Sequence, residues 1–242
     1  MVLGAGGSVS TIVIAVVVVA VVLLCIPSLL AYIGARQRSA VHAYAAAQGW
    51  EHRDNDPGLA TRYTGPPFVA DPDARAESVI DGTYRGLPFA AYAYTYRGDG
   101  SSGSGTTHTI PVVALGLESG LPDLEVTPVP RPRAGPGERW PRAASFAEAF
   151  TVRSADDAFA AELLTARLTH ALMAFPDRAW GFREGDLVSV GSWDGSPERI
   201  VSYLDHLGMV LEAVPDWAWD RYGDGHDPRR RDEQDQPKSS ST

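Results

Sequence analysis

The chain has 242 residues, of which 44% are hydrophobic, enough for a globular domain with its own core. Its formal net charge of −9 at pH 7 excludes an extended nucleic-acid-binding surface, because such a surface needs clustered lysine and arginine. Cys25 is the only cysteine, which excludes an intrachain disulfide and a zinc site built from cysteines.

An apolar run near the N-terminus determines the expected location of the protein. Residues 11–33 carry no charged side chain and follow a short uncharged tail over residues 1–10. A helix of about 20 apolar residues crosses the hydrocarbon core of a bilayer, so we predict a single transmembrane helix over residues 11–33. A cleaved signal peptide explains the run less well, because its apolar core would be shorter and would follow basic residues.

The basic residues near this run predict its orientation. Arg36, Arg38 and Arg53 follow the run, and no arginine or lysine precedes it. The positive-inside rule then places the N-terminus outside and the soluble domain in the cytosol; an uncleaved anchor with the domain exported is the alternative. Lys238 is the single lysine, and this preference for arginine, with abundant Ala, Gly and Pro, is typical of high-GC bacteria, so the membrane is expected to be the plasma membrane.

The segment after the apolar run leads into the soluble domain. Residues 34–48 are rich in alanine and predict a juxtamembrane helix that ends at Gly49. A soluble α+β domain is predicted over residues 49–222. It opens at Trp50 with a polar segment whose residues 54–58 are typical of turns.

Alternating apolar and polar residues predict a sheet. The expected strands are residues 78–85, 89–97, 109–117, 124–129 and 149–153, followed by a hairpin of residues 178–183 and 186–191. Short turns rather than helices separate most of these strands, so we predict a mainly antiparallel sheet and the α+β class.

Two amphipathic helices are expected to pack on this sheet. Ser154 begins the first, whose apolar residues recur at helical spacing to Phe175. Ser196 caps the second, which is predicted over residues 197–214. The polar and charged residues 223–242 are predicted to be a disordered tail.

Two loops invite a functional interpretation. Residues 98–107 are a flexible Gly/Ser loop that contains a formal G-x-G-x-x-G pattern at Gly98, Gly100 and Gly103. Because a strand rather than a helix follows, the pattern does not predict a dinucleotide site. Residues 127–142 alternate proline with arginine and predict a flexible surface loop, with a ligand for a proline-recognising domain as a less specific alternative.

A tyrosine stripe is the most distinctive feature of the predicted sheet. Tyr92, Tyr94 and Tyr96 share one face of a strand. They are expected to pack against a neighbouring element with their hydroxyls at its edge, and a binding surface is the alternative.

The sequence contains no recognisable catalytic or metal-binding motif. The six histidines form no H-E-x-x-H or H-x-H pair, and each is expected to be an ordinary surface or core-edge residue. They are His42, His52, His108, His170, His206 and His226. Turn formation explains Asp54 to Asp56 and Asp71 to Asp73 better than calcium binding does, and Asp224 to Asp227 offers only a loose metal site in the tail. Glu184 and Asp186 flank a turn and are expected to be exposed.

Four short stretches of the soluble part are similar to a known family. They are Ala47 to Trp50, Gly82 to Phe89, Leu121 to Val126 and Phe150 to Val152. With them the chain resembles, over residues 40–219, a family of uncharacterised single-pass membrane proteins of high-GC bacteria. No activity is assigned to that family, so the resemblance implies an architecture and no catalytic residues.

Together these features predict a membrane-tethered module that binds another protein or a peptide, without catalytic activity, cofactor or metal. The lipid bilayer is the expected partner of residues 11–33, and nucleic acid is not expected to bind. Two alternatives stay open: a hydrolase whose residues only the fold brings together, and a small-molecule or lipid sensor with a cavity between sheet and helices.

Overall fold

The computed structural model describes residues 42–98, 105–118, 120–130, 145–191, 197–223 and 227–230. The chain divides into two units, residues 1–47 and 48–242. In the first unit, residues 42–47 are helical; they lie within the expected juxtamembrane helix 34–48, whose residues 34–41 lie outside the described residues. The predicted tail 1–10 and transmembrane helix 11–33 lie outside the described residues. Among the helices that are described, none has both the length and the apolar character needed to cross a bilayer.

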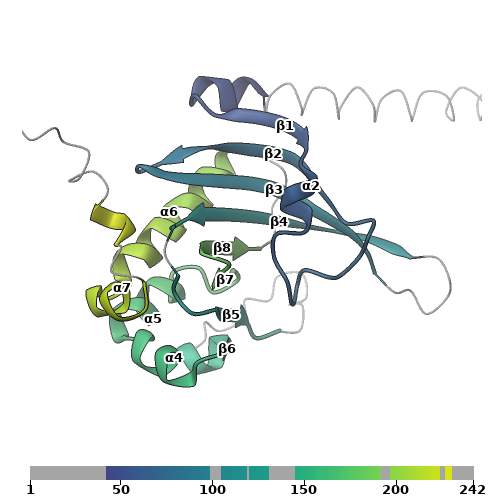
Figure 1. Cartoon of the computed structure of the whole chain (residues 1–242). Coiled ribbons are helices and arrows are strands. Elements are labelled where there is room, and N and C mark those ends of the chain that lie inside the picture. The colour runs from purple at the N-terminus through teal and green to yellow at the C-terminus, as the bar shows by residue number, and fades with distance from the viewer. Residues whose placement is uncertain are drawn as a thin grey trace, which may run out of the picture. The chain divides into compact units, whose positions relative to one another are not determined.

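The second unit is an α+β domain built on a large antiparallel sheet, as the strand pattern predicts (Figure 1). Eight strands pair in the order β1-β2-β3-β4-β8-β7-β5-β6. The strands are β1 (Glu51–Asn55), β2 (Arg75–Tyr84), β3 (Leu87–Gly98), β4 (Thr106–Gly116), β5 (Leu124–Pro128), β6 (Phe150–Ser154), β7 (Ala179–Arg183) and β8 (Asp186–Val190).

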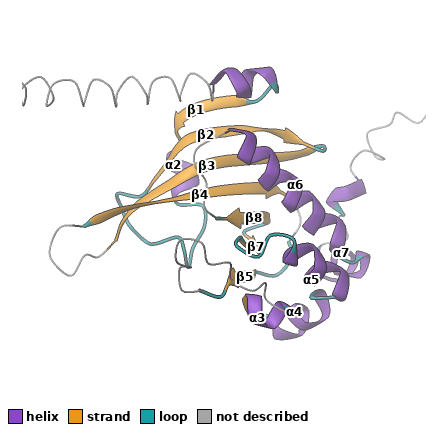
Figure 2. Ribbon diagram, turned by 180° about the vertical axis from the view of Figure 1, so that it is seen from behind, coloured by secondary structure: helices purple, strands orange, loops and turns teal. Residues whose placement is uncertain are grey.

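Helices lie on both faces of this sheet. They are α2 (Pro57–Ala60), α3 (Phe146–Ala149), α4 (Asp157–Leu163), α5 (Ala166–Met173), α6 (Pro197–Ala213) and α7 (Asp216–Tyr222), with a 3₁₀ turn η1 (Pro228–Arg230). The two opposite views place α6 on one face of the sheet and α2 on the other (Figures 1 and 2). The first face is called the α6 face below, and the second the α2 face.

Each face of the sheet has its own apolar core. On the α6 face, the sheet residues Leu115 and Leu187 and the helix residue Leu204 are at most 1% exposed. On the α2 face, the stripe residues Tyr92 and Tyr94 are fully buried. Successive side chains of a strand point to opposite faces of the sheet, so one strand contributes residues to both cores.

The tyrosine stripe is therefore packed against a neighbouring segment, as expected, but the Tyr92 hydroxyl is buried and does not lie at the edge of that segment. Residues 57–74, which contain α2 and the chain that follows it, lie over the stripe and are called the cover segment. The ring of Phe68 is 5.2 Å from that of Tyr94 and 5.1 Å from that of Tyr63, so aromatic contacts join the cover segment to the sheet.

Several local predictions are wrong. The polar stretch after Trp50 is the edge strand β1 followed by α2, because pairing with β2 stabilises a strand whose sequence shows no alternation. The single helix expected from Ser154 to Phe175 is divided into α4 and α5, because Asp156 caps the first and Thr165 caps the second. Helix α3 was not expected at all.

Part of the predicted disordered tail is ordered. Arg229 donates to Asp227 at 2.8 Å and to the carbonyl oxygen of Val214 at 3.0 Å, and it is also paired with Asp216. These contacts hold η1 against the end of α6. The rest of the predicted tail beyond residue 230 lies outside the described residues, as do most of the loops predicted over residues 98–107 and 127–142.

Candidate functional site

A buried carboxylate marks the candidate site. Asp186, the first residue of β8, is 4% exposed on the α2 face of the sheet. The expectation that Asp186 is exposed is therefore wrong, whereas Glu184 at the same turn is exposed as expected. The difference arises because the strand directs Asp186 towards α2, which belongs to a segment far away in the sequence.

Two residues of the cover segment contact this carboxylate. The Tyr63 hydroxyl donates to Asp186 Oδ2 at 2.6 Å, and Arg62 Nη2 lies 2.6 Å from the same oxygen. The side chain of Arg62 is 45% exposed, so it closes the cluster from the solvent side. No bond to Asp186 Oδ1 is found among the described residues, so this oxygen remains available as an acceptor.

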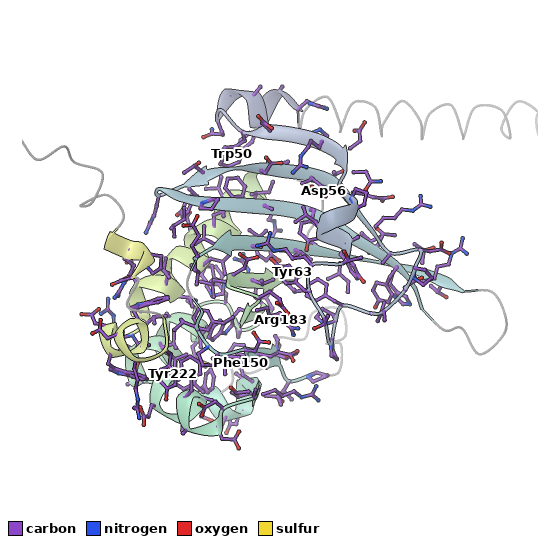
Figure 3. The ribbon with its side chains drawn as sticks, viewed as in Figure 1. Trp50, Asp56, Tyr63, Phe150, Arg183 and Tyr222 are labelled. Atoms are coloured by element: carbon purple, nitrogen blue, oxygen red, sulfur yellow. The ribbon has the colours of Figure 1, made fainter. Side chains whose placement is uncertain are left out.

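Local structure explains how Tyr63 reaches the sheet. Asp56 caps α2 by accepting the backbone N–H of Gly58 at 2.8 Å, and Pro57 occupies the first helical position. This short helix turns the chain towards the α2 face. Tyr63 and Arg183 lie near each other below α2 (Figure 3).

Arg183 of β7 attaches the cover segment to the other half of the sheet. Its guanidinium donates to the carbonyl oxygen of Thr64 at 2.7 Å and to that of Pro66 at 2.6 Å. The guanidinium also pairs with Glu125 of β5 at 3.3 Å, and the Arg183 side chain as a whole is 14% exposed. A planar guanidinium can serve two carbonyl oxygens and a carboxylate at once, so Arg183 fixes the backbone that carries Tyr63.

The Asp186 carboxylate borders a small cavity, called the Asp186 cavity below. The cavity holds about 150 Å³ and is walled mainly by apolar or small side chains. Its lining consists of Leu59, Arg62, Tyr63, Pro88, Phe89, Ala90, Ala114, Gly116 and Asp186. A Cβ added to Gly116 would lie 3.7 Å from Asp186 Oδ1, so the missing side chain leaves the space beside this oxygen open.

Burial sets the electrostatics of the cluster. It raises the pKa of Asp186 above its ordinary value, although the hydrogen bond from Tyr63 and the charge of Arg62 act in the opposite direction. Burial also raises the pKa of Tyr63, and the adjacent Asp186 carboxylate adds to this shift. Tyr63 is therefore a stable hydrogen-bond donor at neutral pH.

A second tyrosine lies within the electrostatic reach of this cluster. Tyr92 is fully buried, and its hydroxyl has no hydrogen-bond partner among the described residues. Burial raises its pKa, opposed by Arg62 and reinforced by Asp186. By contrast, the neighbouring Tyr94 hydroxyl donates to the carbonyl oxygen of Val69 at 3.0 Å and accepts its N–H at 3.2 Å.

A wider cavity lies beside the junction of β1, β2 and β3. It holds about 460 Å³, and its lining includes Trp50, Asp81, Gly82, Thr83 and Phe89. The Trp50 and Phe89 rings meet edge to face at 4.9 Å. A Cβ on Gly82 would come within 2.5 Å of the Trp50 ring, so glycine is required for this packing.

The residues considered from the sequence do not converge on either cavity. His108 and His170 are exposed on separate elements, His206 is buried in α6, and His226 lies outside the described residues. The Asp186 cavity is lined by one carboxylate and by no histidine among the residues that the structure describes. The set of two convergent carboxylates or histidines that would favour a hydrolase is therefore not found in this lining.

The acidic pairs considered for calcium act as turn and cap residues. Asp56 caps α2, and Asp71 accepts the backbone N–H groups of Asp73 at 2.9 Å and Arg97 at 2.8 Å. The G-x-G-x-x-G pattern is followed by strand β4 and not by a helix, as expected.

Sequence reasoning missed Arg62, Tyr63 and Arg183 and misplaced Asp186. One signal pointed to the cover segment: Tyr63 and Phe68 are aromatic residues in an otherwise polar stretch. Large aromatic side chains are usually buried where they occur, so they indicate that this stretch packs on the sheet.

Comparisons with known proteins add information about the fold. No protein-family model matches the sequence. No curated protein matches it either. Among solved structures, the chain is similar to the mycobacterial trehalose monomycolate transport factor A, TtfA, with a TM-score of 0.50 and 14% sequence identity. The similarity covers 74% of this chain and 96% of that one, and at this identity it establishes a shared fold.

Proposed function

We propose that this protein is a membrane-tethered accessory module that binds a segment of a partner protein in the Asp186 cavity and performs no catalysis. The bound group is a side chain with an N–H or O–H donor directed at Asp186 Oδ1. The observation that carries the proposal is the combination of an available carboxylate oxygen with an apolar cavity of about 150 Å³.

The size of the cavity favours a side chain over a whole ligand. Small-molecule sites are usually about 300–1,000 Å³ in volume, so the Asp186 cavity is smaller than such a site. An apolar wall with one precisely placed acceptor suits the tip of a side chain presented by another protein. A lipid-sized ligand would need a larger space than this cavity offers.

The shared fold suggests the process in which the module takes part. TtfA is a transport factor for trehalose monomycolate, and the similarity extends over nearly all of its chain. We infer that the present protein likewise assists the movement of a lipid, by engaging a partner protein. Its own cavity would hold the partner and not the lipid.

The remaining parts of the proposal come from the sequence. Residues 11–33 anchor the protein in the plasma membrane as a single-pass helix, and Arg36, Arg38 and Arg53 favour a cytosolic domain. The chain is proposed to belong to the family of single-pass proteins that it resembles. Reporters that are active only in the cytosol or only after export, fused after Thr242, test the sidedness.

Site-specific photocrosslinking in cells tests the binding function. A photoreactive residue replaces Pro88, which is exposed on the rim of the cavity, and adducts are identified by mass spectrometry. The control position is Thr151, which is exposed on β6. We expect a discrete protein adduct from position 88 and none from position 151.

Two cavity variants make this experiment specific. Asp186→Asn changes the charge of the acceptor but keeps the shape, and Gly116→Ala narrows the cavity, since its Cβ would lie 3.0 Å from Pro88 Cγ. Both variants should reduce the adduct several-fold. An unchanged adduct in both would exclude the cavity as the binding site, and the absence of any adduct would argue against a binding module.

A further inference from the structure

The far half of β4 has a free edge. β3 pairs with β4 from Thr106 to Leu115, whereas β8 pairs with β4 only from Val112 to Gly116. On the side away from β3, the stretch Thr106 to Pro111 therefore has no strand partner among the described residues. This stretch, called the β4 arm, projects beyond β8 in both views (Figures 1 and 2).

The β4 arm lacks the charged side chains that usually protect a free edge, and Pro111 at its inner end is the one protective residue that it carries. Natural sheets discourage pairing between molecules by charged side chains on their edge strands, and the outer strand β1 follows this rule with Glu51, Arg53 and Asp54. The β4 arm reads TTHTIP and has no acidic, lysine or arginine side chain, and its first four residues are exposed. Threonine and isoleucine also favour extended structure.

The other strand of the same hairpin, β3, has partners along its outer edge. The backbone N–H of Arg97 in β3 donates to Asp71 of the cover segment at 2.8 Å, and Thr95 pairs with Arg75 of β2. Across the hairpin, the His108 ring stacks on Tyr96 at 5.3 Å, and the Thr95 and Thr109 hydroxyls lie 3.3 Å apart. The arm is thus a supported strand with a single open side.

We propose that the β4 arm pairs with the β4 arm of a second copy of this chain, antiparallel, about a two-fold axis at His108. The arm sequence is symmetric about this residue, because a threonine stands on each side of it. In this register Thr107 faces the partner's Thr109, and cross-strand threonine pairs are favourable. An antiparallel pair of identical strands satisfies the rule that two-fold interfaces are self-complementary.

The lack of charge on the β4 arm allows two copies of the chain to meet there. Two chains of net charge −9 repel each other over most of their surfaces, but the arm itself is uncharged and projects away from the body. Its short length gives a contact well below the 1,200–2,000 Å² of a standard interface. The dimer is therefore weak and depends on protein concentration. The dimer contact involves no residue of the Asp186 cavity. The dimer proposal can therefore be tested independently of the proposed binding function.

Disulfide trapping of the purified full-length chain in detergent tests this register. The background variant is Cys25→Ser, which removes the only native thiol. His108→Cys places two thiols opposite each other on the axis, within the Cα separation of 4.4–6.8 Å that a disulfide requires. Under mild oxidation we expect about tenfold more covalent dimer from His108→Cys than from Thr107→Cys, whose Cα atoms would be about 8 Å apart.

Two further measurements complete the test. A mixture of Thr107→Cys and Thr109→Cys proteins should form the mixed dimer in preference to either homodimer. In sedimentation experiments, Thr109→Lys should abolish the concentration-dependent dimer while circular dichroism stays unchanged. Equal trapping at positions 107 and 108, or a chain that remains monomeric at all concentrations, would overturn the proposal.

Discussion

The hydroxyl of Tyr63 donates to the carboxylate of Asp186 across 123 residues of sequence, at 2.6 Å. This bond connects the cover segment to the first residue of β8, and Arg183 adds two bonds from β7 to the backbone of the same segment. Polar contacts to specific atoms thus determine where the segment lies, and the aromatic contacts of Phe68 supply its apolar packing. The cavity exists only because both kinds of contact hold the segment over small residues of the sheet.

Removing this donor should destabilise the domain. In Tyr63→Phe the ring still packs, but the buried carboxylate loses a hydrogen bond of the charged type, which contributes roughly 1.5–3 kcal/mol. Urea-induced unfolding should show a loss of this size in the free energy of unfolding.

The control for this variant is Tyr84→Phe. Tyr84 donates to Asp205 Oδ1 at the same distance of 2.6 Å, but in an exposed position. Because water can replace the lost contact there, we expect a loss of less than about 1 kcal/mol. If both variants lost the same free energy of unfolding, burial would not be what makes the bond to Asp186 stronger than the bond to Asp205.

The parts of the fold that local sequence could predict are those stabilised by local patterns. The hairpin of β7 and β8 was predicted to within a residue, because Glu184 and Gly185 supply the two left-handed residues of a tight turn. Most of β3, β5 and β6 was predicted as well, since β5 and β6 alternate apolar with polar residues and β3 alternates tyrosine with smaller residues. The division of the long helix was missed because Thr165 can both continue a helix and cap a new one.

The candidate site could not be predicted in this way, because contacts distant in sequence create it. Asp186 follows a turn, a position that predicts an exposed side chain. It is buried only because the cover segment packs over it. Glu51–Asn55 has a polar sequence and becomes a strand because β2 lies beside it. Arg229 was assigned to a disordered tail, although acceptors at Val214 and Asp216 hold it.

Arg183→Lys should loosen the cover segment without unfolding the sheet. A lysine ammonium cannot donate to both carbonyl oxygens with the planar geometry of the guanidinium, so we expect a loss of roughly 1–3 kcal/mol. Hydrogen exchange should become faster at Val69 and nearby amides, while amides of β3 and β4 stay protected. Arg85→Lys is the control, because the Arg85 and Glu212 side chains are exposed and such pairs contribute roughly 0–1 kcal/mol.

Tyr92→Phe should stabilise the domain. The buried Tyr92 hydroxyl has no hydrogen-bond partner among the described residues, so its removal eliminates an uncompensated desolvation cost of about 1–3 kcal/mol. The matched variant Tyr94→Phe should have the opposite sign, since it removes the bonds between the Tyr94 hydroxyl and Val69. Thermal unfolding of the two variants beside the unmodified chain measures both effects. A loss of stability in Tyr92→Phe would mean that a bound water satisfies the hydroxyl.

His206 should make the domain sensitive to acid. Its ring is fully buried in α6, packs on Phe175 at 4.4 Å, and has no hydrogen-bond partner at either nitrogen among the described residues. Burial, reinforced by the charge of Arg178, lowers the pKa of His206 from 6.5 to about 3. The folded state therefore holds the neutral ring.

The sign of the pH effect follows from this lowered pKa. Between pH 6.5 and 3 the unfolded chain binds a proton at His206 that the folded chain does not bind, so acid favours unfolding. The contribution to the free energy of unfolding is complete above pH 6.5 and is lost as the pH falls towards 3. Over the middle of this range the loss is about 1.4 kcal/mol per pH unit.

His206→Leu should remove this part of the acid sensitivity, because leucine fills a similar space and does not titrate. The measurement is the free energy of unfolding in urea at several pH values from 7 to 4, compared with the unmodified chain. His170→Leu, at an exposed position of α5, is the control and should keep the original slope. Parallel pH profiles for His206→Leu and the unmodified chain would show that the buried ring is not the group that responds to acid.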